Sequence, residues 1–216
     1  MAETRGVPAP GLRERKKLRT RATLIDAAVV LCDRQGFEGT TVDQIAAIAD
    51  VSPRTFSRYF TTKEAVALAL IDEVLGHAAD HLARQPRDLD LYEALRCAYI
   101  GMAEESKHCA AGGLTADRLL QILRIVVSSP ALRHAAIEYR ANPVDLVVAQ
   151  RMGVGVEDRR VKLISAVWGA IMMTALQDAT ANLTDADGVT VDDVLVAFEA
   201  TFVEFVGQIA PLRQVG

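Results

Sequence analysis

The sequence predicts an all-α protein with an N-terminal three-helix domain and a larger C-terminal helical domain. Half of its 216 residues are hydrophobic and the mean hydropathy is +0.17, so the chain can bury a substantial core. Alternating apolar runs, which indicate strands, are few, whereas helix-favouring Ala, Leu and Arg are abundant. Charge also divides the chain. Residues 1–64 carry 11 Lys/Arg against 8 Asp/Glu, a net of +3, and residues 65–216 carry 13 against 20, a net of −7. A basic head on an acidic body suits binding to an anionic partner at one end.

The predicted boundaries place a disordered arm at residues 1–11, a three-helix domain at 12–62 and the C-terminal domain at 63–216. The arm contains Pro8, Pro10 and Gly11 and no periodic pattern. A helix is expected from residue 12 to residue 35 and ends at Gly36. Its first half carries six Lys or Arg residues, too many to be buried, and its second half is apolar.

Residues 41–60 predict two short helices joined by a tight turn. Thr41 is a good N-cap, and Gln44 three residues later completes a capping box. The turn falls at residues 50–51. Ser52 caps the second helix, and Pro53 stands at its first position, where a missing amide hydrogen costs nothing.

The second helix of this pair has two different faces. Phe56 and Phe60 are four residues apart and share an apolar face, whereas Arg54, Ser57 and Arg58 share a polar one. The planar fork of Arg suits guanine edges and phosphate. A solvated amphipathic helix is the alternative interpretation, but basic residues before, within and after the motif favour DNA binding.

This segment resembles the N-terminal domain of the TetR family of transcriptional regulators. The match runs over roughly residues 15–66 and rests on Gly36-Phe37, Thr40-Thr41-Val42, Ile45-Ala46, Val51-Ser52, Thr55-Phe56, Tyr59-Phe60 and Lys63-Glu64. Arg54 stands where many members have Gly, and Ser57 where an aromatic residue is common, so base preference cannot be transferred from relatives. The DNA-binding residues that we predict are Thr41, Ser52, Arg54, Thr55, Ser57, Arg58, Tyr59 and Lys63. We assign base contact to Arg54 and Ser57, and phosphate contact to Thr41, Arg58, Tyr59 and Lys63.

The C-terminal domain reads as a series of longer helices. They are expected at about residues 63–84, 91–106, 116–127, 130–153, 158–182 and 191–209, with a loop at 107–113 and a turn at 185–188. Pro143 should break or kink the fourth of these helices.

Apolar strips on the last two helices predict a dimer surface. The residues are Ser165, Gly169, Met173, Phe198, Phe202 and Phe205. The alternative is that both strips belong to the core of one subunit. We favour a homodimer because a symmetric pair of helix-turn-helix domains reads two half-sites, and because the resemblance implies one.

The resemblance also implies a ligand pocket in the C-terminal domain. Candidate lining residues are Cys97, Tyr99, Met102, Leu123, Tyr139, Trp168 and Met172, which could equally be core. Because few buried charges are expected there, an uncharged and largely apolar effector is favoured.

Other function classes lack the required residues. The groups around Lys107-His108-Cys109 and the pair His77 and His81 provide too few ligands for zinc, so no metal or cofactor is expected. No nucleophile motif, phosphate-binding glycine loop or dinucleotide fingerprint is present, so we do not expect an enzyme. The apolar runs are too short for a membrane span, no signal peptide is evident, and three cysteines require no oxidising compartment.

The sequence therefore predicts a cytoplasmic, ligand-responsive transcriptional regulator. We expect a repressor that binds a palindromic double-stranded DNA operator as a homodimer and is released by a small, largely apolar effector. The alternative is a helical small-molecule carrier that does not bind DNA.

Overall fold

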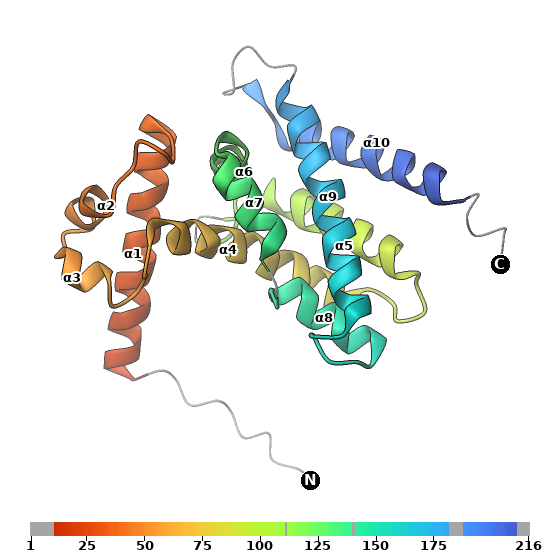
Figure 1. Ribbon diagram of the computed structural model, residues 1–216, viewed down its shortest axis with the longest axis horizontal. Helices are drawn as coiled ribbons and strands as arrows, with labels where there is room; N and C mark the ends of the chain where they lie inside the picture. The colour runs from red at the N-terminus through yellow and green to blue at the C-terminus, as the bar shows by residue number, and fades with distance from the viewer. Residues whose placement is uncertain (1–10, 111, 140, 182–187, 211–216) are drawn as a thin grey trace, which may run out of the picture.

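The computed structural model describes residues 11–110, 112–139, 141–181 and 188–210, and the regular elements in these ranges are helices (Figure 1). The predicted all-α class is confirmed. The helices are α1 (Leu12–Gln35), α2 (Val42–Ile48), α3 (Pro53–Phe56), α4 (Lys63–Arg84), α5 (Leu91–Ser106), α6 (Ala116–Ser128), α7 (Pro130–Glu138), α8 (Pro143–Met152), α9 (Arg159–Ala181) and α10 (Val191–Ile209). Residues 1–10 of the predicted arm, and most of the turn expected at 185–188, lie outside the described residues.

The first three helices form a small head with its own core. The first turns of α1 are exposed, and its second half is buried, as the charge pattern predicts. Leu24, Ile45 and Phe56 are each at most 1% exposed at the centre of the head. The rings of Phe56 and Phe60 pack 5.9 Å apart. This core fixes α2 and α3 against α1.

Helix α3 is shorter than expected. It ends at Phe56, and the chain continues as turns to Phe60. The amides of Arg58 and Tyr59 donate to carbonyls three residues back, as in a 3₁₀-helix, so the chain is wound more tightly here than in an α-helix. The hydroxyl of Ser57 donates to the carbonyl of Pro53, a local bond that competes with regular helix geometry.

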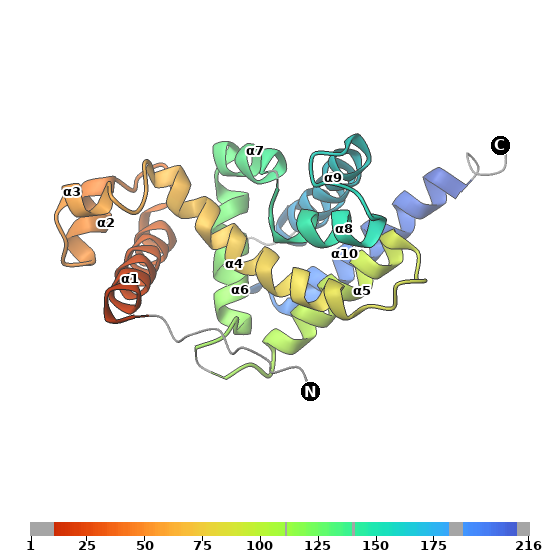
Figure 2. The same ribbon diagram turned by 90° about the horizontal axis from the view of Figure 1, so that it is seen from below.

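Helix α4 connects the head to the body and packs in both (Figure 2). Its N-cap is Thr62, whose hydroxyl accepts from the amide of Ala65. Val66 near the start of α4 and Leu82 near its end are completely buried. One helix therefore runs from the core of the head into the core of the body.

The helix expected at residues 130–153 is two separate helices. Pro143 is the first residue of α8, and the side chain of Asn142 caps α8 by accepting from the amides of Val144 and Asp145. Ala141 before this cap has a φ of 54°. Gly153 ends α8 in the left-handed conformation, as a C-terminal glycine commonly does.

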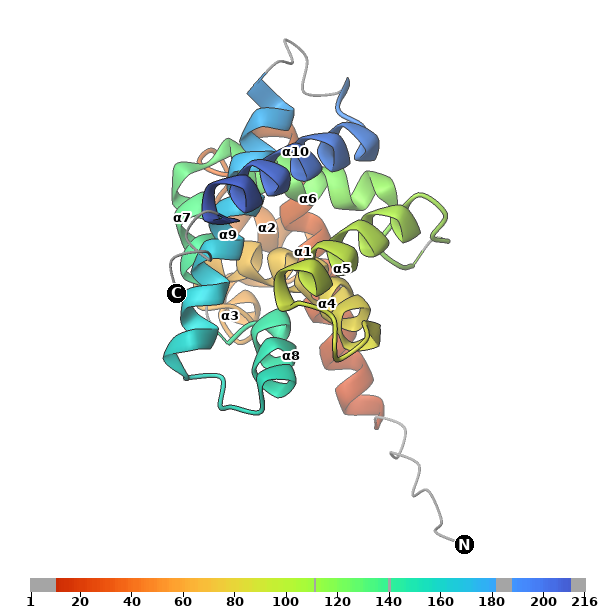
Figure 3. The ribbon, with the colours of Figure 1, turned by 90° about the vertical axis from the view of Figure 1, so that its right-hand side faces the viewer.

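Helices α9 and α10 pack together on the side of the body opposite the head, where α10 faces the viewer in Figure 3. The apolar strip predicted as the dimer surface mostly faces inward. Phe198 and Phe202 are 2% and 6% exposed and pack around Trp168. Phe205 is half-buried against Tyr92. The burial of Phe198 and Phe202 fits the alternative stated above, in which the strip belongs to the core of one subunit, because helix periodicity cannot tell which partner an apolar face contacts.

A different set of residues forms the outer face of this helix pair. The exposed positions of α10 include Val196, Ala200, Val203 and Gly207, which follow a helical spacing, and those of α9 include Leu163, Ala170 and Thr174. Among the described helices, none is long and apolar enough to cross a membrane.

Candidate nucleic-acid interface and internal cavity

The two short helices of the head are held by the caps that the sequence predicts. The hydroxyl of Thr41 accepts from the amide of Gln44, and the side-chain carbonyl of Gln44 accepts from the amide of Thr41 at 3.0 Å. Ser52 accepts from the amide of Thr55 at 3.1 Å. Between the helices, Asp50 takes a φ of 52°, a conformation that Asp tolerates better than most residues. The tight turn therefore orients α3 across α2.

Two guanidinium groups are presented on the exposed side of this unit. Arg54 and Arg58 are exposed and have no side-chain hydrogen bond or ion pair with any residue that the structure describes. Ser57 is exposed beside them, and Tyr59 is half-buried. Thr55 is half-buried, and its hydroxyl lies 2.9 Å from that of Ser52. The arginines are available for an external anion or base.

Lys63 has partners that sequence reasoning did not foresee. Its ammonium donates to the carbonyls of Phe37, Thr40 and Glu38 at 3.0, 3.3 and 3.5 Å. It also lies 4.4 Å from the centre of the Phe37 ring, a cation–π distance. In this conformation the hydrogen bonds of Lys63 hold the loop between α1 and α2 against the start of α4. A phosphate contact would require the ammonium to leave these carbonyls.

The start of α1 adds a basic surface beside the turn of the motif. Arg15, Lys16 and Arg19 line a shallow groove with Ala49 and Val51. The three basic side chains are exposed and, within the described ranges, have no side-chain hydrogen bond or ion pair. This surface extends the positive charge of the head beyond α3.

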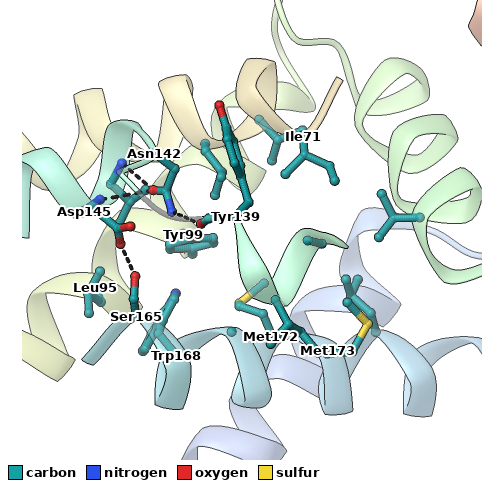
Figure 4. A pocket seen from close by; sticks show the side chains of 18 of the residues that line it. Ile71, Leu95, Tyr99, Tyr139, Asn142, Asp145, Ser165, Trp168, Met172 and Met173 are labelled. Carbon is teal, nitrogen blue, oxygen red and sulfur yellow. Dashed lines mark hydrogen bonds between the residues drawn. The ribbon is translucent and has the colours of Figure 1, made fainter. Parts of the chain in front are cut away.

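The body holds a partly open cavity of about 130 Å³ between helices α4 to α9 (Figure 4). Five of the predicted residues line it: Tyr99, Leu123, Tyr139, Trp168 and Met172. Cys97 and Met102 do not line it. On α5 the cavity is reached by Leu95 and Tyr99, which are four residues apart and share a face, whereas Cys97 is directed to Glu93.

Three residues assigned to the dimer surface also line the cavity, namely Ser165, Gly169 and Met173. A side chain at Gly169 would meet open space, because no atom lies within 4 Å of an added Cβ. Within the subunit, Gly169 is therefore not in close contact with another helix, and the small residues Ser165 and Gly169 leave room inside the body.

Sequence reasoning missed the polar end of the cavity. Asn142 and Asp145 line it and are 8% and 4% exposed. The carboxylate of Asp145 accepts a hydrogen bond from the hydroxyl of Ser165. In the sequence, Asp145 looks like an ordinary acidic residue in the first turn of a helix, so no local signal marks it as buried.

Tyr139 links the cavity wall to α4. Its phenol donates to Oδ1 of Asp72 at 2.9 Å. Burial, together with the adjacent Asp72 carboxylate, raises the pKa of Tyr139 to about 12. Burial also raises the pKa of Tyr99, with a smaller increase from the charge of Asp145. Both phenols therefore keep their protons at neutral pH.

Helices α6 and α7 provide further contacts between body and head. The buried hydroxyl of Ser129, at the start of α7, donates to the carboxylate of Glu38 at 2.7 Å. Arg118 on α6 pairs with Asp26 of α1 at 3.3 Å and with Glu73 of α4 at 3.2 Å. The orientation of the head thus depends on α6 and α7 as well as on α4.

No cluster of three metal-binding side chains occurs among the residues with described positions. His81, half of the pair considered for zinc, instead contacts Glu105 at 2.6 Å.

Comparison with known proteins agrees with this architecture. Residues 24–70 match the family described as "Bacterial regulatory proteins, tetR family". The HTH-type transcriptional regulator TcmR of Streptomyces glaucescens is 34% identical over 176 residues, which cover 78% of this chain and 76% of TcmR. Among solved structures, SmeT, the repressor of the Stenotrophomonas maltophilia multidrug efflux pump SmeDEF, superposes with a TM-score of 0.53 at 19% identity, over 85% of this chain and 89% of SmeT. A TetR-family regulator of Streptomyces coelicolor gives a TM-score of 0.51 at 19% identity, over 92% and 98% of the two chains.

The helix-turn-helix head and the helical body define a DNA-binding transcriptional regulator. The chain belongs to the TetR family. Members of this family bind DNA and small-molecule ligands and are not enzymes, as the sequence predicts for this chain.

Proposed function

We propose that the protein is a homodimeric repressor that binds a palindromic operator and releases it when a small molecule fills the cavity of the body. The observation that carries the proposal is the course of α4. It starts beside the helix-turn-helix, and Ile71, Val74 and Leu75 on it form part of the cavity wall. An occupant of the cavity contacts the same helix that positions the DNA-binding head.

On the DNA side, Arg54 and Ser57 are assigned to base edges, because they are exposed at the end of the motif that enters a major groove. Arg58, Tyr59 and Thr41 are assigned to phosphates, and the basic start of α1 assists them. Ser52 and Thr55 contribute by fixing the first turn of α3. Lys63 is assigned to phosphate only if its ammonium is released from the loop carbonyls.

The dimer is proposed to form through the outer face of α9 and α10. Val196 and Val203 are 71% and 66% exposed on α10, and Leu163 is 62% exposed on α9. An apolar face of this kind typically marks an interaction site. Its position opposite the head leaves both helix-turn-helix units of a pair accessible to DNA.

Release of DNA requires that the effector bind one conformation more tightly than the other. A ligand of equal affinity for both conformations shifts nothing, however tightly it binds. The hydrogen bond of the cavity residue Tyr139 to α4 supports such a difference, because an occupant that moves Tyr139 also acts on α4. SmeT, which shares the fold, has been solved in complex with triclosan, an example of a small-molecule complex in this architecture.

The proposal is tested by selecting bound sequences from a random pool of duplex DNA. A palindromic consensus is expected. The variant Arg54→Ala should weaken binding by about 1–3 kcal/mol and relax preference at one position per half-site. The matched variant Arg58→Ala should weaken binding to all sequences alike and lower the salt slope by about one.

The alternative is a small-molecule carrier that does not bind DNA. It predicts that a duplex of random sequence is not shifted at low salt and that no consensus emerges from selection. Arg54 and Arg58 are exposed on the head and have no side-chain partner in the described ranges, which favours the regulator. A regulator of this kind acts on DNA in the cytoplasm, which is the compartment that we propose.

A further inference from the structure

The cavity of the body has a polar end and an apolar end. In Figure 4, Asp145, Ser165, Tyr99 and Trp168 lie together, whereas Ile71, Met172 and Met173 lie at the other side. A ligand that fills this space must present different chemistry at its two ends.

Asp145 is a buried carboxylate with few hydrogen-bond partners. It is 4% exposed, and its one side-chain partner among the described residues is the hydroxyl of Ser165. A carboxylate has two oxygens and can accept about four hydrogen bonds. No described Lys, Arg or His side chain lines the cavity. Burying a charge is costly unless it is paired, so the site lacks a cation.

Trp168 borders the same end of the cavity. It is 4% exposed, and its buried indole nitrogen lies beside the side chain of Tyr99. An ammonium ion carries only donors, so it would approach the face of the indole ring rather than this N–H group.

The aromatic rings beside Asp145 are suited to a cation. The rings of Tyr99 and Trp168 are 5.4 Å apart, and both residues line the cavity. Aromatic faces attract ammonium groups, more strongly when water is excluded. A carboxylate next to two aromatic rings is a combination that recognises an ammonium ion rather than an anion or a neutral hydrocarbon.

We propose that the cavity selects organic cations, molecules with an ammonium group on an apolar body, and that Asp145 is the counter-ion. The ammonium lies between Asp145 and the rings of Tyr99 and Trp168, and the apolar body extends toward Ile71, Met172 and Met173. This inference rests on the proposed function in so far as the ligand acts as the effector. It replaces the expectation of an uncharged, largely apolar effector, which assumed that few charges are buried in the body.

A matched pair of probes tests the role of charge. Benzylamine is an ammonium ion at neutral pH, and benzyl alcohol is a neutral molecule of nearly the same shape. A single ring suits a cavity of about 130 Å³, since an engineered cavity of about 150 Å³ binds benzene. Calorimetric titration of the full chain should show that benzylamine binds at least about tenfold more tightly, because charge-assisted hydrogen bonds are roughly twice as strong as neutral ones.

The variant Asp145→Asn identifies the counter-ion. Asn keeps the shape of Asp and an oxygen that accepts from Ser165, but removes the charge. The preference for benzylamine should fall to about twofold or less, whereas benzyl alcohol should bind as in the wild type, which shows that the cavity is intact. The control is Asp178→Asn, which removes the same charge from an exposed position of α9 and should leave both affinities unchanged.

The outcomes separate this inference from the proposed function. Equal binding of the two probes, preference for the alcohol, or binding of neither overturns the cation site. If Asp145→Asn does not fold, the preference of the wild-type chain still decides. Operator selection is performed on the same preparations. A consensus operator without amine preference leaves the regulator in place and refutes the cation site, and the reverse result refutes the regulator alone.

Discussion

The phenol of Tyr139 donates a hydrogen bond of 2.9 Å to Asp72, so a residue that lines the cavity from outside α4 is bonded directly to α4. Tyr139 lies just after α7, and Asp72 lies near the middle of α4. The ring of Tyr139 faces the cavity while its hydroxyl reaches the helix (Figure 4). A ligand that moves this ring therefore changes a bond to the helix that carries the head.

We expect Tyr139→Phe to separate ligand binding from the DNA response. The ring that contacts the ligand remains, whereas the bond to α4 is lost. Ligand affinity measured by calorimetry should change little, and the factor by which the ligand weakens operator binding should fall. Because coupling is reciprocal, the operator should also weaken ligand binding by the same reduced factor. An unchanged coupling factor would show that α4 responds through other contacts.

Alkaline pH should destabilise the protein in part through the same residue. The pKa of Tyr139 is about 12 in the folded chain, against an ordinary value of 10.0. Between these values the folded chain retains a proton that the unfolded chain releases. Stability present below about pH 10 is therefore lost as the pH rises toward 12. Thermal melts across this range should show a shallower decline for Tyr139→Phe than for the wild type. Tyr99→Phe should act in the same direction, since burial raises the pKa of Tyr99.

The local elements of the fold could be predicted because their signals are short-range. The capping box of Thr41, the cap at Ser52 and the break at Pro143 depend on neighbours within a few residues, and each was found at the predicted position. The length of α3 was overestimated because the pattern of Phe56 and Phe60 persists through turns as well as through a helix.

The sites were harder to predict because they depend on contacts between distant segments. Lys63 bonds to the carbonyl of Phe37, 26 residues earlier, and nothing in the sequence specifies that contact. Phe202 and Val203 are adjacent, yet one is core and the other exposed, and only the packing of α10 decides which. Asp145 is identified as a cavity residue only when α8 is placed against α9.

We expect Lys63→Met to lower the free energy of unfolding by more than it lowers the free energy of binding to DNA phosphates. The methionine keeps an apolar stem of similar length but loses the hydrogen bonds to three carbonyls. Hydrogen bonds of charged groups contribute about 1.5–3 kcal/mol, so we expect a loss of about this size in urea unfolding. The control is Lys162→Met, whose exposed partner is Glu157 and whose loss should cost less than about 1 kcal/mol. Unchanged stability combined with a salt slope lowered by one would instead establish the phosphate contact.

Val203→Asp should dissociate the proposed dimer without unfolding the subunit. Val203 is 66% exposed in the single chain, so a carboxylate there is hydrated in the monomer and costly in an apolar interface. Sedimentation should show a monomer with unchanged helical circular dichroism and weakened operator binding. The control is Leu146→Asp on α8, 54% exposed, which should leave the mass unchanged. A dimeric Val203→Asp variant would place the interface elsewhere.

The volume of the cavity sets a relation between affinity and response. At about 130 Å³ it is smaller than the roughly 300–1,000 Å³ of most pockets for drug-sized ligands. For a molecule that fits only after the walls move outward, the measured affinity is the intrinsic affinity multiplied by the fraction of molecules that are already expanded. A mutation that enlarges the cavity in advance would then strengthen binding yet weaken the signal, since less of the wall would have to move. Empty space inside this subunit is thus a quantity on which selection for sensitivity can act, alongside the side chains that touch the ligand.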